Sequence, residues 1–236
     1  MIDFDRPRTD VLRLRLNRPE RRNALDRAMV ECLIDAFAED DGDTSVVVLS
    51  ANGSFCSGLD LSMADREREE VSDRLYELYS LMVRFPRPIL AAARGHAMGA
   101  GAQLLVASDL RVVAPGSEIR FPGPAHGLAV GSWALPGLIG RGRAMDLCLT
   151  MRAVGAEEAL RIGLVDRVAD EPEAAALALG FEFAELDKQA VERVKAVMLE
   201  ASGQARALER EADANRGRVP SVHQEVAPDR GEERAR

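Results

Sequence analysis

The sequence predicts an α/β fold with a separate helical region at its C-terminal end. Short apolar or alternating runs typical of strands are separated by segments with helical spacing, as expected for such a fold. Two of the strand-like runs lead into glycine-bearing turns, at residues 50–61 and 93–104. We expect a core over residues 1–170, a helical region over 171–215, and a charged, mobile tail over 216–236.

The first third of the chain alternates strands with helices. Residues 11–16 alternate apolar and charged side chains, which predicts a half-buried strand. Asp26 can cap a helix whose apolar stripe includes Met29 and Leu33. Residues 45–50 (SVVVLS) predict a short strand that is covered on both faces. After the first glycine-bearing turn, helical spacing relates Val71, Leu75, Leu78, Tyr79 and Met82.

One stretch in the middle of the chain links a strand to a helix through a tight turn. Pro86 and Pro88 end the preceding helix, residues 88–93 read as a buried strand, and residues 104–108 read as a helix. Between them lie Gly95, Gly99 and Gly101. Glycines at such a joint indicate a sharp bend or a close approach to the backbone. The N–H groups that begin a helix lack partners and attract negative charge.

The remaining elements are shorter and are followed by helices. We expect strands at residues 109–114 and 118–121, an irregular loop at 122–136, helices at 143–150 and 156–162, and an extended piece at 164–168. Gly163 is a typical C-terminal stop for the second of these helices.

The composition disfavours several classes of function. The net charge of -8 argues against general nucleic-acid binding. No apolar run reaches the ~20 residues that cross a bilayer, and the N-terminal residues lack a secretory pattern, so we expect a cytoplasmic protein without a membrane span. Three scattered cysteines and three histidines predict neither disulfides nor a metal site.

The two glycine-bearing turns can serve one chemical purpose. If they lie side by side in the sheet, their backbone N–H groups can converge on one oxygen as an oxyanion hole, where one donor is worth about 10²–10³ in rate. A structural corner or a phosphate site is the alternative for each turn alone. The glycine spacing at residues 95–101 matches neither the P-loop nor the dinucleotide-binding pattern.

The chain resembles the enoyl-CoA hydratase/isomerase, or crotonase, family. Four stretches carry the resemblance, in the family's order: residues 16–25 (LNRPERRNAL), 55–61 (FCSGLDL), 95–104 (GHAMGAGAQL) followed by 108–111 (SDLR), and 156–165 (AEEALRIGLV). The resemblance implies a spiral of ββα turns with a C-terminal helical region, a homotrimer or a dimer of trimers, and an acyl-CoA thioester as the ligand. It implies no cofactor apart from the CoA of that ligand.

The resemblance also implies a set of site residues. The oxyanion-hole donors would be the backbone N–H groups of Leu59 and Ala100. The CoA moiety would lie near one loop and against the backbone of the first hole turn, which involves Arg21, Arg22, Asn23, Ala24, Asp60 and Leu61.

Two positions depart from the pattern of the family's hydratases, which hold a water between two glutamates. The first glutamate position is Gln103 here, and the second is Ala125. A glutamine amide can hold a water but cannot take its proton, and alanine can do neither. Because acid–base groups each contribute about 10²–10⁴ in rate, we expect acyl-CoA binding with little hydration.

Several other residues have both a functional and a plain structural interpretation. His126 is the titratable residue nearest in sequence to the second position and could be a base, or could face solvent. His96 and Cys56 are expected to be structural, Trp133 to line an acyl tunnel or the core, and the side chain of Asp60 to cap the next helix.

Three functions remain open from the sequence. The preferred one is an acyl-CoA-binding, enoyl-CoA hydratase-like protein that holds a fatty acyl thioester carbonyl in the hole with weak or no hydratase activity. The alternative is an active hydratase, isomerase or acyl-CoA hydrolase with replacement groups such as His126 or Gln103. The third is a structural partner of an active paralogue in a mixed trimer.

Overall fold

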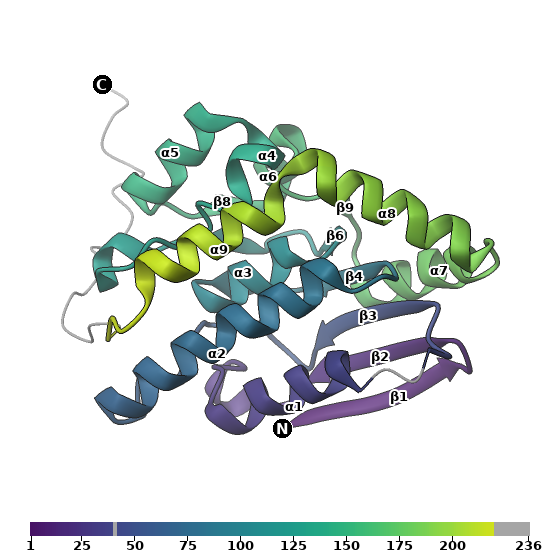
Figure 1. Cartoon of the computed structure of the whole chain (residues 1–236), viewed down its shortest axis with the longest axis horizontal. Coiled ribbons are helices and arrows are strands. Elements are labelled where there is room, and N and C mark those ends of the chain that lie inside the picture. Colours follow the sequence, from purple (N-terminus) through teal and green to yellow (C-terminus); the bar gives the residue numbers. More distant parts are fainter. Residues whose placement is uncertain (40–41, 220–236) are drawn as a thin grey trace.

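The predicted α/β fold with a C-terminal helical region is confirmed in the computed structural model, which describes residues 1–39 and 42–219 (Figure 1). The six-stranded sheet has the order β1-β2-β3-β4-β6-β9, and every neighbouring pair is parallel except β1 and β2. Its strands are β1 (Ile2–Arg8), β2 (Val11–Leu16), β3 (Val46–Ala51), β4 (Ile89–Ala93), β6 (Leu110–Val113) and β9 (Arg167–Val168). The three-stranded sheet contains β5 (His96–Met98), β7 (Glu118–Arg120) and β8 (Val154–Gly155).

Helices surround both sheets. They are α1 (Arg27–Ala38), α2 (Asp65–Arg84), α3 (Ala100–Ala107), α4 (Leu135–Ile139), α5 (Arg141–Thr150), α6 (Ala156–Ile162), α7 (Pro172–Ala184), α8 (Lys188–Ser202) and α9 (Gln204–Asn215), with 3-10 turns η1 (Pro19–Arg21) and η2 (Gly123–His126). The predicted cap of α1 is confirmed, because the Asp26 carboxylate accepts from Met29 N at 2.9 Å. Helix α6 ends at Gly163 in the left-handed conformation, as predicted.

The six-stranded sheet is covered on both faces. On β3, Val47 and Leu49 face the main core that α1, α2 and α3 complete, whereas Val46 and Val48 face a second apolar cluster with α7. This burial confirms the expectation of a strand covered on both sides. It also explains why the strand is apolar throughout rather than alternating.

Parallel pairing brings three chain segments to one edge of the sheet. Strand β2 runs in register with β3, so that Leu16 pairs with Ala51, and β3 is paired in turn with β4. The segments that follow these strands therefore leave the sheet at the same edge. Ligands of open parallel sheets are found at this edge.

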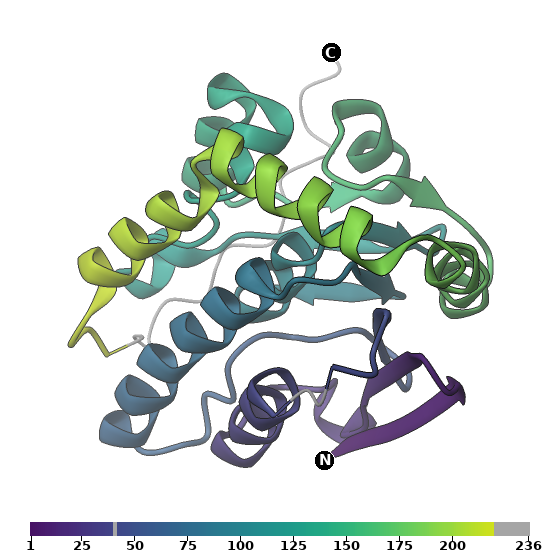
Figure 2. The same cartoon turned by 45° about the vertical axis from the view of Figure 1, so that its right-hand side comes forward.

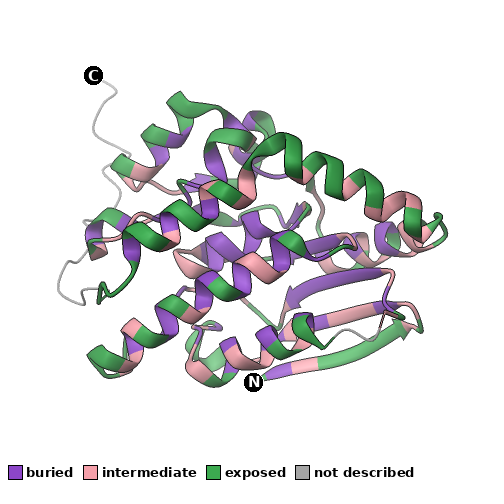
Figure 3. Cartoon of the chain, in the orientation of Figure 1, coloured by how far each residue is buried: buried purple, intermediate pink, exposed green. Residues whose placement is uncertain are grey.

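The C-terminal helices differ in how much they bury. Helix α9 packs along α2, and the two helices run side by side in both views (Figures 1 and 2). Helix α8 bridges α7 and α9 and is largely exposed, whereas α3 lies in the core (Figure 3).

Three details differ from the sequence expectations. Strand β1 was not predicted, and within it only Ile2 is buried, so it leaves little apolar signal. The short strand β5 lies inside the second glycine-bearing turn and was also missed. Helix α3 starts at Ala100 rather than at residue 104, because the glycines themselves enter its first turn. Of the expected mobile tail, residues 220–236 lie outside the described residues.

Candidate functional site

Backbone pairing holds the two glycine-bearing turns together. Cys56 N donates to His96 O at 2.9 Å, and Met98 N donates to Cys56 O at 3.0 Å. Phe55 N donates to Arg94 O at 2.8 Å in the same direction. The turn after β3 and the turn after β4 are thus fixed against each other by three main-chain hydrogen bonds.

The glycines allow this close approach. A β-carbon on Gly101 would lie 2.4 Å from Cys56 O, a distance that real β-carbons do not adopt. Gly58 has a φ of +104°, and a β-carbon there would lie 3.0 Å from Met98 O and 3.8 Å from Ala100 N. The start of α3 therefore lies directly beside Gly58, and side chains at either glycine would separate the two turns.

A cavity of about 100 Å³ opens over the joined turns. Leu59 and Ala100 both line it, as do Gln103 and His126. Its other lining residues are Ser57, Gly58, Leu61, Ser72, Leu75, Tyr76, Tyr79, Gly99, Pro122, Gly123, Leu128 and Val130. The residues expected from the two turns are therefore brought to one cavity, which η2 and α2 close from other sides. None of these described lining residues carries a carboxyl group.

Leu59 and Ala100 have unused backbone donors. The neighbouring donors are committed, because Asp60 N donates to Leu25 O at 2.9 Å and Gly99 N to Arg120 O at 3.0 Å. Within residues 1–39 and 42–219, no protein acceptor is found for the N–H groups of Leu59 and Ala100. Ala100 begins α3, where the helix has no intrahelical partner to offer its N–H.

Gln103 lines the cavity, and its side-chain oxygen is hydrogen-bonded to residues outside the cavity lining. Its Oε1 accepts from Trp133 Nε1 at 2.7 Å and from Gly131 N at 3.4 Å, and the residue is 4% exposed. The oxygen is therefore occupied by an indole N–H. Ala125 is buried in η2 and does not line the cavity.

A buried carboxyl group on α9 organises the segment behind Gln103. Glu211 Oε2 accepts from Ser132 Oγ at 2.5 Å and Trp133 N at 3.0 Å, and its Oε1 accepts from Tyr76 Oη at 3.0 Å and Gly131 N at 3.2 Å. Burial raises the pKa of Glu211, and these hydrogen bonds oppose that rise only in part.

Glu211 lies outside the motifs from which the site was predicted. One signal was present in the helix pattern, because Leu208, Glu211 and Asn215 are spaced as one face of α9 and all three are buried. A glutamate at an apolar position of an amphipathic helix indicates a buried polar contact.

The other residues with two interpretations differ in whether they line the cavity. His126 lines the cavity, whereas His96 does not, and the backbone of His96 serves the pairing of the two turns. Trp133 is buried behind Gln103 rather than on the cavity wall. Cys56 is fully buried, and burial raises the pKa of its thiol to about 12, so the structural interpretation of this cysteine is supported.

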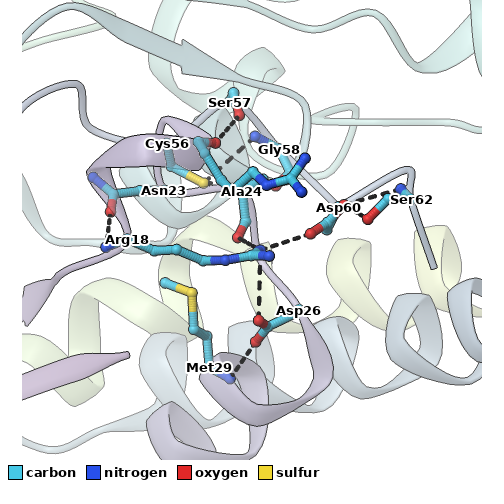
Figure 4. Close-up of polar contacts among 11 residues, drawn as sticks. Arg18, Asn23, Ala24, Asp26, Met29, Cys56, Ser57, Gly58, Asp60 and Ser62 are labelled. Atoms are coloured by element: carbon cyan, nitrogen blue, oxygen red, sulfur yellow. Dashed lines mark hydrogen bonds and ion pairs between the residues drawn. The ribbon is translucent and has the colours of Figure 1, made fainter.

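The loop after β2 is tied to the first turn through Arg18 (Figure 4). Its guanidinium donates to Asp60 Oδ2 at 2.6 Å and to Ala24 O at 3.1 Å, and Asp26 lies 3.5 Å away. Burial alone would raise the pKa of Asp60, but hydrogen bonds from Ser62 and Arg18 outweigh it and lower the pKa to about 2. The charged carboxylate of Asp60 thus links the first turn to the loop after β2 through Arg18.

Asp60 does not cap the next helix, which corrects that expectation. Its Oδ1 accepts from Ser62 N at 2.9 Å and Ser62 Oγ at 2.6 Å, whereas α2 begins at Asp65 with Ala64 as an N-cap that makes no side-chain hydrogen bond. The physical reason is the strong pairing with Arg18, which keeps the carboxylate on the loop side.

The residues expected to contact CoA differ in accessibility. Arg21 and Arg22 are exposed, and Leu61 is 39% exposed at the cavity rim. Asn23 is fully buried, because its amide donates to Asn52 O at 3.0 Å and Ser54 O at 2.6 Å while its oxygen accepts from Arg18 N at 2.6 Å. The side chain of Asn23 therefore shapes this loop from inside.

Comparison with known proteins identifies the family. The family model described as enoyl-CoA hydratase/isomerase matches residues 7–227. The chain belongs to this family. The match covers both turns, the cavity and α9.

Relatives within the enoyl-CoA hydratase/isomerase family are similar over most of their length. A probable enoyl-CoA hydratase, echA6, of Mycobacterium bovis is 40% identical over 193 residues, which are 80% of this chain and 78% of the relative. Among solved structures, a probable enoyl-CoA hydratase of Mycobacterium thermoresistibile has a TM-score of 0.82 at 28% identity, covering 91% of this chain and 94% of that one. Enoyl-CoA hydratase of Bacillus anthracis has a TM-score of 0.80 at 28% identity, with coverages of 90% and 89%.

Two features are absent from the described residues. No helix among them is long and apolar enough to span a bilayer. No group of three or more His, Cys, Asp or Glu side chains in this part of the chain is arranged to hold a metal ion.

Proposed function

We propose that this protein binds an acyl-CoA thioester and polarises its carbonyl, with weak or no hydratase activity. The observation that carries the proposal is the cavity over the two turns. It has two unused backbone donors, from Leu59 and Ala100, yet none of its described lining residues has a carboxyl group. Binding and polarisation need the donors, whereas hydration needs a proton acceptor as well.

The donors would act as an oxyanion hole. Both N–H groups belong to turns that are fixed against each other before a ligand arrives, so no reorganisation is needed when charge develops on the thioester oxygen. Ala100 also begins α3, and the positive end of a helix favours an oxygen that carries negative charge. The small residues around Gly58 and Gly99 leave room for a thioester to reach the backbone.

The residues that replace the two glutamates support the weak hydratase activity that we propose. The oxygen of Gln103 accepts from the Trp133 indole at 2.7 Å, and the NH₂ group can only donate, so the amide cannot take a proton from a water in the cavity. Ala125 has no polar side chain and does not line the cavity. A loss of two such groups corresponds to a rate deficit of several powers of ten, since each is worth about 10²–10⁴.

An active enzyme is the second candidate, and His126 is the observation that favours it. His126 lines the same cavity as the two donors, and an imidazole side chain can serve as a general base. Such an enzyme would be a hydratase, isomerase or acyl-CoA hydrolase that works through this one residue.

The CoA moiety would lie across the loop after β2. Arg21 and Arg22 are exposed there and can approach phosphates, while Ala24, Asp60 and Leu61 can offer backbone groups beside the cavity rim. The tie from Arg18 to Asp60 and Ala24 would keep this surface in place.

Binding and turnover can be measured separately. Calorimetry with crotonyl-CoA should show binding, and the enoyl absorbance should stay unchanged when the same substrate is incubated with the protein. Turnover that is lost in His126→Ala would replace the proposal by the second candidate. Failure of crotonyl-CoA and of a longer enoyl-CoA to bind would overturn both.

A homotrimer, or a pair of trimers, is the assembly we propose, from the family resemblance and one surface. No residue of α8 is buried within the described chain. Three apolar side chains on this helix are more than half exposed: Val194, Val197 and Met198. Several exposed apolar side chains on one helix are typical of a face that is covered in an assembly.

A further inference from the structure

The cavity over the two turns shares one described lining residue with a second cavity. The second cavity, of about 550 Å³, lies between α2 and α9. Its walls include Leu208 and Ala212 from α9, with charged residues such as Asp213 and Arg216. Among the described residues, Tyr76 alone lines both cavities. Tyr76 therefore lies where the two cavities adjoin, and we call its side chain the partition between them.

Hydrogen bonds fix this partition from the side of α9. The Tyr76 hydroxyl donates to Glu211 Oε1 at 3.0 Å or to Ala129 O at 3.2 Å, and it accepts from Asn215 Nδ2 at 2.5 Å. Asn215 Nδ2 also donates to Ala129 O at 2.6 Å, which closes the group. Tyr76 is only 8% exposed, and its ring packs edge-on against Tyr79 at 5.8 Å between centroids. Displacement of the side chain about χ1 would break several of these contacts together.

The first cavity is small on the scale of acyl chains. An enclosed apolar cavity of about 150 Å³ accommodates one benzene molecule. The cavity here measures about 100 Å³, and the thioester itself must occupy the part next to Leu59 and Ala100. Only a few carbons beyond the carbonyl then fit before the chain meets the partition.

We propose that Tyr76 is an end-stop that restricts the acyl group to a short chain, and that Glu211 and Asn215 hold it in place. This inference rests on the proposed acyl-CoA binding and names its substrate class. A longer chain would have to displace the ring and enter the cavity beside Leu208 and Ala212. Tyr76 is thus a specificity-determining residue on the wall of the cavity, and Glu211 and Asn215 are positioning residues.

The test is calorimetric binding of butyryl-CoA, octanoyl-CoA and dodecanoyl-CoA to the full chain and to Tyr76→Ala. In the wild type, affinity should not rise from butyryl-CoA to dodecanoyl-CoA. In Tyr76→Ala, the affinity for dodecanoyl-CoA relative to butyryl-CoA should increase by about tenfold or more, the effect of burying roughly two further CH₂ groups. Tyr76→Leu should shift the same ratio in the same direction by less.

Leu75→Ala is the matched control, since Leu75 lines the first cavity only. It enlarges that cavity without removing the partition, so the affinity ratio should change by no more than about fourfold, the effect of roughly one further CH₂ group. Equal shifts in Tyr76→Ala and Leu75→Ala would overturn the inference. A wild type that already binds dodecanoyl-CoA far more tightly than butyryl-CoA would overturn it without any variant. If no acyl-CoA binds the wild type, the proposed function itself is wrong.

Discussion

Gly101 lies at the closest contact between the two turns, where the backbone of α3 meets Cys56. The β-carbon of an alanine there would lie 2.4 Å from Cys56 O and 2.6 Å from Cys56 Cβ. The neighbouring atoms are main chain and a buried residue, so they cannot move aside cheaply. The contact explains why a glycine occupies the first turn of a helix, where its flexibility is otherwise unfavourable.

Gly101→Ala should destabilise the protein by about 3 kcal/mol, since the extra methyl forces the two turns apart in a packed core. Urea unfolding at neutral pH would measure the change. Gly142→Ala is the control, because Gly142 lies in α5 with no atom within 4 Å of the new β-carbon. That substitution should be neutral or stabilise by roughly 0.5–1 kcal/mol. Similar losses in both variants would contradict the packing argument.

The sequence predicted which residues form the candidate site better than it predicted the contacts that these residues make. The glycine pattern was sufficient to expect the two turns at one place, and the family resemblance pointed to Leu59 and Ala100, which both line the cavity. The residue type of Gln103 was enough to exclude a proton acceptor at this position. Its hydrogen bond with Trp133 could not be predicted from the sequence. That partner is thirty positions away in the chain, and no local rule connects them.

At the scale of elements, α9 supports the cavity through Glu211. This one carboxyl group accepts hydrogen bonds from Tyr76 on α2 and from residues 131–133, so it joins a helix, a loop and the cavity partition. A buried acid with a raised pKa binds its proton more tightly in the folded state than in the unfolded state.

The stability contribution of Glu211 should therefore depend on pH. The contribution is complete below the ordinary glutamate pKa of 4.5. It is lost as the pH rises through the higher pKa that Glu211 has in the folded protein. The free energy of unfolding of the wild type, minus that of Glu211→Gln, should fall between pH 4.5 and pH 8. Urea unfolding at several pH values would measure it. Glu209→Gln, at an exposed position on the same helix, should show no such trend, and a flat difference for Glu211→Gln would refute the prediction.

Helices with a cap or a clear stripe were predictable, and elements defined by distant partners were not. The Asp26 cap and the apolar face of α2 are local patterns. Strand β5 exists because residues 96–98 pair with β7, and β1 exists because it pairs with β2. Their own side chains carry little periodic signal. Glu211 belongs to the same class, since its partners come from two distant segments, α2 and residues 131–133.

At the scale of the whole molecule, the exposed apolar face of α8 predicts self-association. Light scattering should give three or six times the mass of one chain. Val197→Asp combined with Met198→Asp should reduce that mass toward a single chain, because two charges would be placed in an apolar interface. Phe4→Asp, an exposed apolar position on β1, is the control and should leave the mass unchanged. A monomeric wild type would exclude the assembly.

The architecture of the whole molecule was predictable because it repeats one physical rule. Strands that are apolar throughout must be covered on both faces, and the alternating helices provide that cover. The position of α9 against α2 does not follow from this rule. It depends on Leu208 and on buried polar groups that pair across about 135 positions of sequence.

That long separation has a consequence for how the chain reaches its native state. Contacts between distant segments form late and slowly, because loop closure must precede them. During synthesis, the sheet and the two turns are complete in sequence well before α9 has left the ribosome. We therefore expect a nascent chain to hold a folded sheet while Tyr76 is still unrestrained. In hydrogen exchange after refolding, amides of residues 129–133 should gain protection later than those of β3 and β4.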